Sequence, residues 1–430
     1  MRLRAWLILL VALALARGAA AQGSGALLLS IDGPLTPAHA AYLERGLDRA
    51  NRSGAEVAIL LLNTPGGQLD LMDSLVALIR NSSTPVVVYV APRGATAGSA
   101  GTIITLAGHL SAMAPETVIG AASPVGSQGE DLGQTLESKL KEDLKAKVRV
   151  LAAARPPEAI ALAEDTIQNA AAATADEAYA VGLVDFLAAD VGDLLRQLDG
   201  RSVTINGQTR VLHTAGLATS ELPMNLLETT LELLTNPNVV FLLLALGAQA
   251  ILIELSSPGG WVAGFLGVVF LALALYGLGV LPVNWFGLVF ILAAFVLFAM
   301  EVYAPTHGAL ALTGTASLVV GALVLFNSPS SPDFYRVSVP LVVSTSAVVA
   351  VAFVALITFA LRAQRRPIAV GVESLLGREG EVRTPESVQV AGELWSAEPA
   401  EGVAKLEPGQ QVVVAAVRGL RVLVKPKAKS

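Results

Sequence analysis

The spacing of apolar positions changes twice along this chain of 430 residues. In the first half, short runs of β-branched residues and leucine alternate with longer stretches at helical spacing, as expected for α/β crossover units on a largely parallel sheet. The chain up to about Leu198 is long enough to bury a substantial core without disulfides. Strands are expected at 26–31, 57–62, 86–90, 118–119 and 183–186, and helices at 37–52, 69–80, 99–110, 136–154, 157–169 and 174–180.

Two further features follow the α/β pattern. Residues 202–214 predict a hairpin around Asn206-Gly207, a pair that tolerates positive φ at both central turn positions. Residues 222–234 carry apolar side chains at helical spacing, with Glu228 and Glu232 on the opposite side. Such a helix fits the surface of a membrane, and it fits a simple linker equally well.

Long apolar runs replace this pattern between residues 239 and 361. Their charged side chains are Glu254, Glu301, Asp333 and Arg336. At about 1.5 Å per residue, each run is long enough to cross the hydrocarbon of a membrane. Five spans are predicted, at 239–256, 260–278, 284–303, 308–326 and 339–361.

The basic residues after the last span predict the orientation of the chain. Arg362, Arg365 and Arg366 follow this span directly, so the positive-inside rule places that end in the cytoplasm. Five crossings then place the α/β region outside the cytoplasm. The predicted location is the cell membrane, with several spans.

The N-terminus agrees with this orientation. Arg2 and Arg4, an apolar core at 5–16 and three alanines before Gln22 have the pattern of an export signal. Cleavage there would remove residues 1–21 as a signal peptide. The alternative is an uncleaved anchor helix, which changes the tether rather than the side of the membrane.

The first four spans contain a weak internal repeat. Glu254 and Gly267 recur as Glu301 and Gly314 at one offset, which predicts two duplicated helix pairs. Both glutamates are expected at the inner ends of their spans, where a carboxylate reaches water. An intramembrane carboxylate pair that handles ions or protons is the functional alternative.

After the last span, the chain returns to short alternating runs separated by Gly, Pro and Glu. Runs at 380–382, 388–390, 411–416 and 421–424 predict a small β-barrel of OB type. Such barrels often bind nucleic acid, but Trp395 is the single aromatic residue of the segment, so a basic aromatic face is absent. A module for protein contact or structural support is expected instead.

Composition narrows the function further. The chain is 53% hydrophobic and 15% charged, which indicates an integral membrane protein. A net charge of −6 and scattered basic residues argue against a nucleic-acid partner. The sequence contains no cysteine, so disulfides, thiolate catalysis and cysteine-based metal sites are excluded and a hydroxyl remains as the candidate nucleophile.

Two glycine-rich segments carry the candidate chemistry. The segment 96–102, Thr-Ala-Gly-Ser-Ala-Gly-Thr, places Ser99 among small residues where a strand gives way to an apolar helix. Upstream, Asn63-Thr64-Pro65-Gly66-Gly67 ends another apolar run, and its adjacent glycines allow backbone N–H groups to point at a developing oxyanion. Together the segments predict acyl transfer, whereas either segment alone is more typical of a structural turn.

The histidines are poorly placed to serve Ser99 as a base. His109 stands ten residues along the expected Ser99 helix, so it points away from the serine and lies far along the axis. His39, His213 and His307 lie near the first helix, in the late hairpin and at the membrane. A Ser-His-Asp triad is therefore not expected.

A lysine can act as the base instead if burial disfavours its ammonium form. The helix at 136–154 offers four candidates, and periodicity alone does not choose among them. Lys147 lies closest to the apolar stripe of this helix, whereas Lys139 sits to one side. The four are Lys139, Lys141, Lys145 and Lys147.

These features in this order resemble the NfeD-type membrane-bound serine proteases, relatives of ClpP within the ClpP/crotonase fold. The Asn-Thr-Pro-Gly-Gly and Ser-Ala-Gly-Thr segments carry the resemblance, with the export signal, the lysine-bearing helix, the membrane spans and the β domain. Segments 112–115, 120–121 and 174–185 also match the family pattern. The resemblance implies a ClpP/crotonase-like α/β domain at 25–215, an amphipathic linker at 216–238, an all-α bundle of about five transmembrane helices at 239–361 and an OB-like β-barrel at 368–430.

The family motifs assign roles to individual residues. They place the nucleophile on Ser99 and the lysine base on Lys139, with Lys141 as the fallback, although the apolar stripe favours Lys147. The implied oxyanion hole uses the backbone N–H groups of Gly67 and Ala100. Two departures concern the substrate cleft, because the family commonly has Asp in place of Asn63 and an aromatic residue in place of Ile103.

The resemblance implies a membrane-anchored serine endopeptidase that uses a Ser-Lys dyad to hydrolyse apolar peptide segments of membrane-associated proteins. No metal or cofactor is required. The implied partners are a peptide or protein substrate, a stomatin-type SPFH membrane protein, membrane lipid and further copies of the chain in a homo-oligomer. One alternative is a non-proteolytic membrane scaffold for an SPFH-type protein. Another, an acyl-thioester enzyme of crotonase type, is disfavoured by the export signal.

Overall fold

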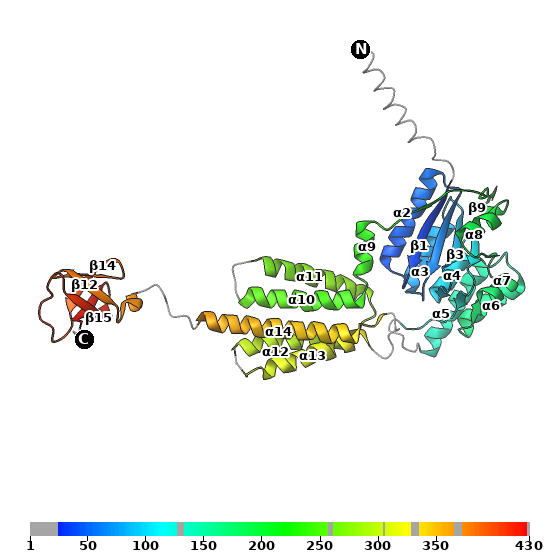
Figure 1. Cartoon of the computed structure of the whole chain (residues 1–430). Helices are drawn as coiled ribbons and strands as arrows, with labels where there is room; N and C mark the ends of the chain where they lie inside the picture. The colour runs from blue at the N-terminus through cyan, green and yellow to red at the C-terminus, as the bar shows by residue number, and fades with distance from the viewer. Residues whose placement is uncertain are drawn as a thin grey trace, which may run out of the picture. The chain divides into compact units, whose positions relative to one another are not determined.

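The computed structural model describes residues 25–126, 133–256, 261–303, 306–327, 335–364 and 372–427. The predicted export signal lies outside the described residues. In chain order the described part comprises an α/β domain, a set of long apolar helices and a small β domain (Figure 1). The predicted order of architectures is therefore confirmed.

The α/β domain is built on a six-stranded sheet whose paired strands are all parallel. Every residue of β3 is buried, as expected for a strand covered on both faces. The strand order is β11-β1-β2-β3-β5-β8, formed by β1 (Ala26–Asp32), β2 (Val57–Asn63), β3 (Val86–Val90), β5 (Leu110–Met113), β8 (Phe186–Leu187) and β11 (Thr219–Glu221).

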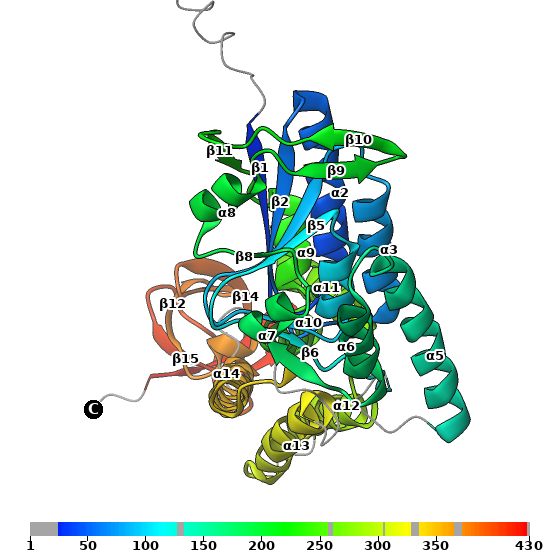
Figure 2. The ribbon, with the colours of Figure 1, turned by 90° about the vertical axis from the view of Figure 1, so that its right-hand side faces the viewer.

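Separate apolar clusters fill the two sides of this sheet. The larger cluster holds residues of α2 and α3, and the smaller one holds residues of α8 and β9. In Figure 2, α3 and α8 accordingly lie on opposite sides of the strands. The covering elements are α2 (Pro37–Ser53), α3 (Leu69–Arg80), α4 (Ala100–Ala107), α5 (Gln134–Leu151), α6 (Pro157–Gln168), α7 (Ala175–Ala180), α8 (Val191–Leu198) and the hairpin of β9 (Ser202–Ile205) with β10 (Gln208–Val211).

A second, three-stranded sheet was not predicted from the apolar pattern. It has the order β4-β6-β7, from β4 (Thr96–Gly98), β6 (Val118–Gly120) and β7 (Ala172–Thr174). The helix predicted at 99–110 also ends early, at Ala107, and Leu110 already belongs to β5. Gly108 permits this turn, because a Cβ there would lie 2.5 Å from the Leu110 carbonyl oxygen. The bounds of the strand predicted at 183–186 are wrong, since β8 is Phe186–Leu187.

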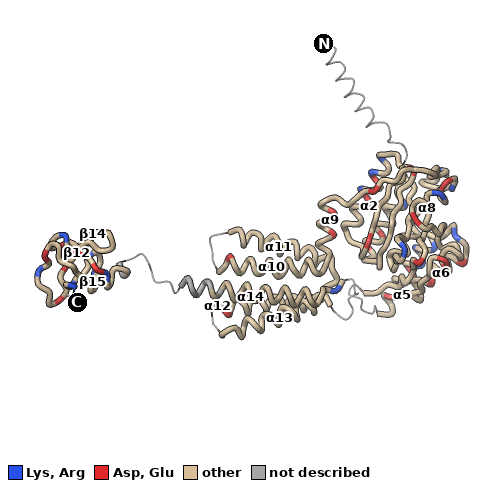
Figure 3. The backbone as a smooth tube through the Cα atoms, viewed as in Figure 1, with Lys and Arg blue, Asp and Glu red and all other residues tan. Residues whose placement is uncertain are grey.

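Helices lie at each of the five predicted membrane segments. Among the described residues, α10, α11, α13 and the Val339–Leu356 part of α14 are long and apolar enough to cross a membrane. The apolar stretch of α12 is shorter, at Phe286–Glu301. Lys, Arg, Asp and Glu are sparse along these helices compared with the two flanking domains (Figure 3). The helices are α10 (Pro237–Ser256), α11 (Val262–Val280), α12 (Phe286–Tyr303), α13 (Ala309–Phe326) and α14 (Val339–Gln364), preceded by the short α9 (Leu226–Leu233).

The internal repeat corresponds to two helix hairpins with the same contacts. In each hairpin, a glutamate near the end of one helix accepts hydrogen bonds at the N-terminus of the next. Glu301 accepts from the N–H groups of Thr306, Gly308, Leu310 and Ala311, and Glu254 accepts from those of Trp261 and Gly264. These helix N-termini leave donors that the carboxylates satisfy. A structural capping role therefore accounts for the recurring glutamates without ion or proton handling.

We expect Glu301→Ala to destabilise the α12–α13 hairpin by about 1–3 kcal/mol, because it leaves buried N–H groups without an acceptor. Glu301 is itself buried, and its carboxylate also accepts from the Thr306 hydroxyl at 2.7 Å. Amide hydrogen exchange of the full chain in lipid nanodiscs measures the effect at residues 306–311. Glu401→Ala, at an exposed position of the β domain, is the control. Unchanged protection at 306–311 would argue against the capping role.

The C-terminal domain is a closed five-stranded barrel with the order β12-β13-β14-β16-β15. The β14–β16 pair is parallel and the other pairs are antiparallel. Buried valines from four of the five strands fill the barrel. The elements are η2 (Val372–Leu375), β12 (Glu379–Thr384), β13 (Ser387–Val390), β14 (Glu393–Pro399), β15 (Gln411–Arg418) and β16 (Arg421–Pro426), of which β14 was not predicted.

Candidate active site

Ser99 occupies the turn between β4 and α4, where its backbone has φ 52° and ψ −118°. A positive φ in a residue with a side chain costs about 1–3 kcal/mol, so the surrounding structure must impose it. The Ser99 N–H donates to the Gly120 carbonyl at 2.9 Å, and the Ser99 carbonyl accepts from the Thr102 N–H at 3.0 Å. Such a strand–turn–helix arrangement presents a hydroxyl at a sharp bend, as nucleophilic serines require.

The Thr102 side chain stabilises this turn through hydrogen bonds. Its side chain is fully buried, and its hydroxyl lies 2.9 Å from the Ala97 carbonyl and 3.1 Å from the Gly120 carbonyl. The same hydroxyl accepts from the Gly120 N–H at 3.0 Å. Thr102 thereby joins β4 to β6 next to the Ser99 turn. Sequence reasoning did not assign a role to Thr102.

The Asn63–Gly67 loop lies against Ser99. Thr64 pairs with β4, donating its N–H to the Thr96 carbonyl at 2.7 Å and accepting from the Gly98 N–H at 2.9 Å. Gly66 has φ +116°, and a Cβ there would lie 2.7 Å from the Cβ of Ser99 and 3.2 Å from its Oγ. The two glycine-rich segments predicted to work together are thus in direct contact.

The amide groups of this region provide candidate oxyanion donors. Within the described residues, no hydrogen bond is recorded from the N–H of Gly67 or of Ala100. Ala100 is the first residue of α4, so its N–H has no partner inside the helix. Gly67 is held close to Leu35, since a Cβ on Gly67 would lie 2.6 Å from that of Leu35.

Asn63 has a positioning role that the sequence did not reveal. Its side-chain amide donates to Asp32 Oδ1 at 2.8 Å, and its Oδ1 accepts from the Thr96 N–H at 3.0 Å. The side chain therefore connects the carboxyl ends of β1 and β2 to β4. A carboxylate could accept from Thr96 but could not donate to Asp32. The Asn at this position, a departure from the family pattern, is explained by this contact.

We expect Gly66→Ala to slow any reaction at Ser99 by about 10²-fold, because the added methyl group would displace the Ser99 side chain from its position. The positive φ of Gly66 adds backbone strain. The rate of fluorophosphonate labelling of Ser99 measures the effect. Gly216→Ala is the control, since Gly216 shares a positive φ of +73° but its added Cβ would meet no atom within 4 Å. Equal rates in both variants would show that the close contact does not matter.

The four candidate lysines lie on α5 in different environments. Lys139 is exposed, and no hydrogen bond or ion pair within the described part of the chain joins it to Ser99. Lys141 pairs with Glu137 at 2.7 Å and donates to the Gln168 carbonyl, and Lys145 pairs with Glu142. The structure thus brings Gly66 into contact with Ser99, beside its chain neighbour Ala100, but it does not bring Lys139 there.

Lys147 is committed to an ion pair. Its Nζ lies 2.8 Å from Asp73 of α3 and 3.2 Å from Asp143. Partial burial alone would lower the pKa of Lys147, but the hydrogen bonds from the two carboxylates outweigh it and raise the pKa. A lysine held in its ammonium form cannot accept the serine proton. The apolar-stripe argument for Lys147 is therefore not supported by this geometry.

The two halves of α5 differ in packing. Leu144 and Val148 lie in the main core, as the predicted stripe requires, but Leu136 is 50% exposed. Leu151 also packs against this core, but no described α5 residue before Leu144 belongs to it. Lys139 therefore stands on a part of the helix that no core contact holds.

The histidines remain unsuited to catalysis. His109 lies beyond the end of α4, and its Nδ1 accepts from the Val86 N–H at 3.2 Å. Burial and the nearby Arg80 lower the pKa of His109 to about 4. His39 caps α2, and His213 is exposed. Within the described residues, no group of three or more His, Asp or Glu side chains is arranged to hold a metal ion.

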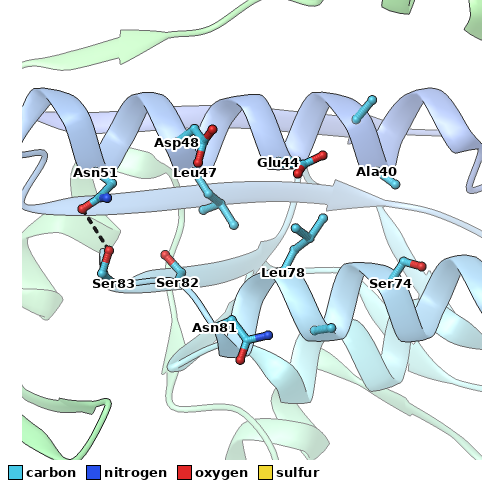
Figure 4. A pocket seen from close by; sticks show the side chains of 12 residues that line it. Ala40, Glu44, Leu47, Asp48, Asn51, Ser74, Leu78, Asn81, Ser82 and Ser83 are labelled. Carbon is cyan, nitrogen blue, oxygen red and sulfur yellow. Dashed lines mark hydrogen bonds between the residues drawn. The ribbon is translucent and has the colours of Figure 1, made fainter.

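A groove of about 590 Å³ lies between α2 and α3, apart from this site. Figure 4 shows Glu44 and Asp48 of α2 facing Ser74 and Leu78 of α3, and the hydrogen bond that joins Asn51 to Ser83. None of the residues that line the groove belongs to the Ser99 turn or to the Asn63–Gly67 loop. The groove is therefore separate from the candidate active site.

Comparison with known proteins finds similarity along nearly the whole chain. Residues 28–207 match the NfeD1b N-terminal domain, residues 238–359 the NfeD integral membrane domain and residues 372–426 the NfeD-like C-terminal, partner-binding domain. Membrane-bound protease PH1510 of Pyrococcus horikoshii is 31% identical over 406 residues, which cover 92% of this chain and 91% of that protein. Membrane protein NfeD1b of Bacillus subtilis is 28% identical over 299 residues, covering 67% of this chain and 64% of that protein.

Solved structures of the Pyrococcus horikoshii protease domain are also similar. One, described as a membrane protease specific for a stomatin homolog, is 29% identical with a TM-score of 0.42, covering 50% of this chain and all of that one. Another is a lysine-to-alanine mutant of a membrane-bound stomatin-specific protease in complex with a substrate peptide. It is 30% identical with a TM-score of 0.44, covering 48% of this chain and 95% of that one.

Proposed function

Because the chain belongs to the NfeD family, together with the membrane-bound protease of Pyrococcus horikoshii, we propose that it is a serine endopeptidase that uses Ser99 and Lys139 as a dyad. The family relationship supports a membrane protease. The single observation that carries the assignment of the nucleophile is the strained Ser99 turn packed against Gly66. Strained backbone of this kind is common at active sites, where the surrounding structure maintains it.

In the proposed reaction, the neutral amine of Lys139 takes the proton from Ser99 Oγ as the oxygen attacks the peptide carbonyl. The N–H groups of Gly67 and Ala100 donate to the resulting oxyanion, and each such donor contributes about 3 kcal/mol to the transition state. The lysine ammonium then protonates the leaving amine, and water hydrolyses the acyl-enzyme with Lys139 again as base. The N-terminal turns of α5 have to approach Ser99 for this chemistry, and the absence of core contacts at Leu136 and Lys139 permits such movement.

We further propose that the substrates are apolar segments of membrane-associated proteins and that a stomatin-type SPFH protein is the partner. The support is the specificity of the Pyrococcus horikoshii protease for a stomatin homolog and the match of residues 372–426 to a partner-binding domain. Homo-oligomerisation and contact with membrane lipid belong to the same proposal. We infer an OB-like barrel for residues 372–426 from its closed order and the parallel β14–β16 pair.

The proposed topology places the α/β domain outside the cytoplasm and the β-barrel inside. Its support is the cluster of Arg362, Arg365 and Arg366, which follows the last predicted span at 339–361, and the predicted export signal. This orientation needs five membrane crossings, so α12 must cross the membrane as well as α10, α11, α13 and α14. A reporter fused after Arg366 tests it, and an external signal there would reject the orientation.

A fluorophosphonate probe tests the proposed function. Such probes form a covalent bond with activated serines, so the full chain in detergent should be labelled on the peptide that contains Ser99, as located by mass spectrometry. The exposed position of Lys139 favours the alternative of a non-proteolytic membrane scaffold for an SPFH-type protein. Absence of labelling in both detergent and lipid vesicles would support this scaffold and reject the protease.

A further inference from the structure

Helix α9 has an unusual distribution of polarity for a helix packed on a folded domain. Among its eight residues, all of which the structure describes, Glu228 is the buried one. Three of its four leucines point outward instead, with Leu226 85%, Leu227 67% and Leu233 54% exposed, and Leu231 is half-buried. An ordinary amphipathic helix would bury these leucines and expose the glutamate.

The polar side of α9 is committed to α2. Both carboxylate oxygens of Glu228 lie 2.6 Å from the Arg45 guanidinium, and Glu228 also accepts from the Asn225 N–H at 2.8 Å. The Arg45 hydrogen bonds hold the pKa of Glu228 below its usual range. One turn later, Glu232 Oε1 lies 3.4 Å from the Nε2 atom of the buried His39. Rotation of α9 to bury its leucines would break these contacts, so the apolar side must be covered by something else.

The chain itself shows what lies next to this apolar side. Helix α9 ends at Leu233, and α10 begins at Pro237. In the part of the chain that the structure describes, α10 is the first apolar helix long enough to cross a membrane. The three residues between α9 and α10 span at most about 14 Å even when fully extended. That distance is close to the diameter of one helix with its side chains, so α9 lies at the membrane boundary.

We propose that α9 lies in the plane of the membrane interface, with Leu226, Leu227 and Leu233 inserted among the lipids of the membrane that α10 enters. The carboxylates of Glu228 and Glu232 contact α2 at the same time, so the α/β domain lies directly on the lipid surface. Apolar side chains on one face and committed charges on the other are the pattern of interfacial helices.

A short series of contacts connects α9 to the Ser99 site. Glu232 contacts His39, which caps the start of α2 beside Leu35. The Leu35 N–H donates to the Gly66 carbonyl at 2.9 Å, and Leu35 is packed against Gly67. The edge of the domain that carries the site is therefore the edge nearest the membrane. Resting on the proposed function, this consequence names the substrate class as peptide segments next to the lipid surface.

Single cysteine reporters test the proposal, because the chain has no cysteine of its own. Leu227→Cys and Leu233→Cys carry a nitrobenzoxadiazole fluorophore on the full chain in phosphatidylcholine vesicles. The matched control is Val211→Cys, at an exposed apolar position of β10. The β9–β10 hairpin packs on the sheet face opposite to α2. We expect lipids with a nitroxide on the acyl chain to quench positions 227 and 233 several-fold more strongly than position 211, and aqueous iodide to quench in the reverse order.

Two outcomes would overturn the proposal. Equal quenching by iodide at all three positions would mean that the leucines face water. Protection of 227 and 233 from both quenchers would mean that a second copy or a partner protein covers them. The quenching measurement does not depend on proteolysis. Failure of fluorophosphonate labelling would therefore reject the proposed function without affecting the proposed insertion of α9 among the lipids.

Discussion

Replacing Ser99 with alanine should lower peptide hydrolysis by roughly 10⁴- to 10⁶-fold, because the attacking oxygen is lost while the fold is retained. A methyl group fits the space of the Ser99 side chain, and the backbone hydrogen bonds to Gly120 and Thr102 remain. Cleavage of an apolar peptide by the full chain in lipid vesicles measures this loss. Circular dichroism and the thermal midpoint should stay close to those of the unmodified chain.

The control for this experiment is Ser74→Ala. Ser74 lies exposed on α3, and its hydroxyl bonds only to the Asp70 carbonyl one turn earlier. Activity should remain within about twofold of the unmodified value, as for most surface substitutions. Substantial cleavage by the Ser99→Ala variant would assign the reaction to another residue, and equal loss in both variants would indicate a defect of preparation rather than of chemistry.

The apolar pattern predicted the architecture because most elements of the α/β domain are long and regularly spaced. The fully apolar run of β3 and the amphipathic α2 are found within one residue of their predicted bounds. Strands β4 and β7 have three residues each, too few for a period to appear. Strand β5 was hidden because its apolar residues continue those of α4, and only the tight turn at Gly108 separates the two.

The site could be predicted in part for a related reason. The contact of Gly66 with Ser99 follows from two motifs that each need small residues, and such residues are visible in a sequence. The roles of Asn63 and Thr102 are not visible, because they depend on β4 lying between β2 and β6. The polarity of α9 was read correctly as two-sided, yet the sequence cannot show that Arg45, almost two hundred residues earlier, binds its buried glutamate.

Sequence and structure differ most over which lysine acts as the base for Ser99. Helical periodicity points to Lys147, since it assumes that a catalytic side chain lies near the buried stripe. The ion pair with Asp73 could not be foreseen, because α3 and α5 are far apart in sequence. The family motif points to Lys139, on turns of α5 that make no core contact. A residue exposed in the free protein can still act once substrate binding has drawn it into the cleft.

Lys139→Ala should lower the rate of Ser99 labelling by about 10²- to 10⁴-fold, the usual contribution of a general base. Lys139→Arg should be as slow as the alanine variant, since a guanidinium keeps a positive charge but does not give up its proton. The rate of fluorophosphonate labelling of the full chain, compared with that of the unmodified chain, measures both variants.

Lys147→Ala and Lys141→Ala distinguish the rival assignments in the same series. Loss of the Lys147–Asp73 pair should cost less than about 1 kcal/mol of stability, because the pair is partly exposed, and it should leave the labelling rate within about threefold. If labelling is lost in Lys147→Ala alone, the Asp73 pair must open during catalysis and the apolar stripe identified the base correctly. If it is lost in Lys141→Ala alone, the family register is shifted within α5. Retention of the labelling rate in every lysine variant would mean that Ser99 is activated without an amine, and the dyad would have to be abandoned.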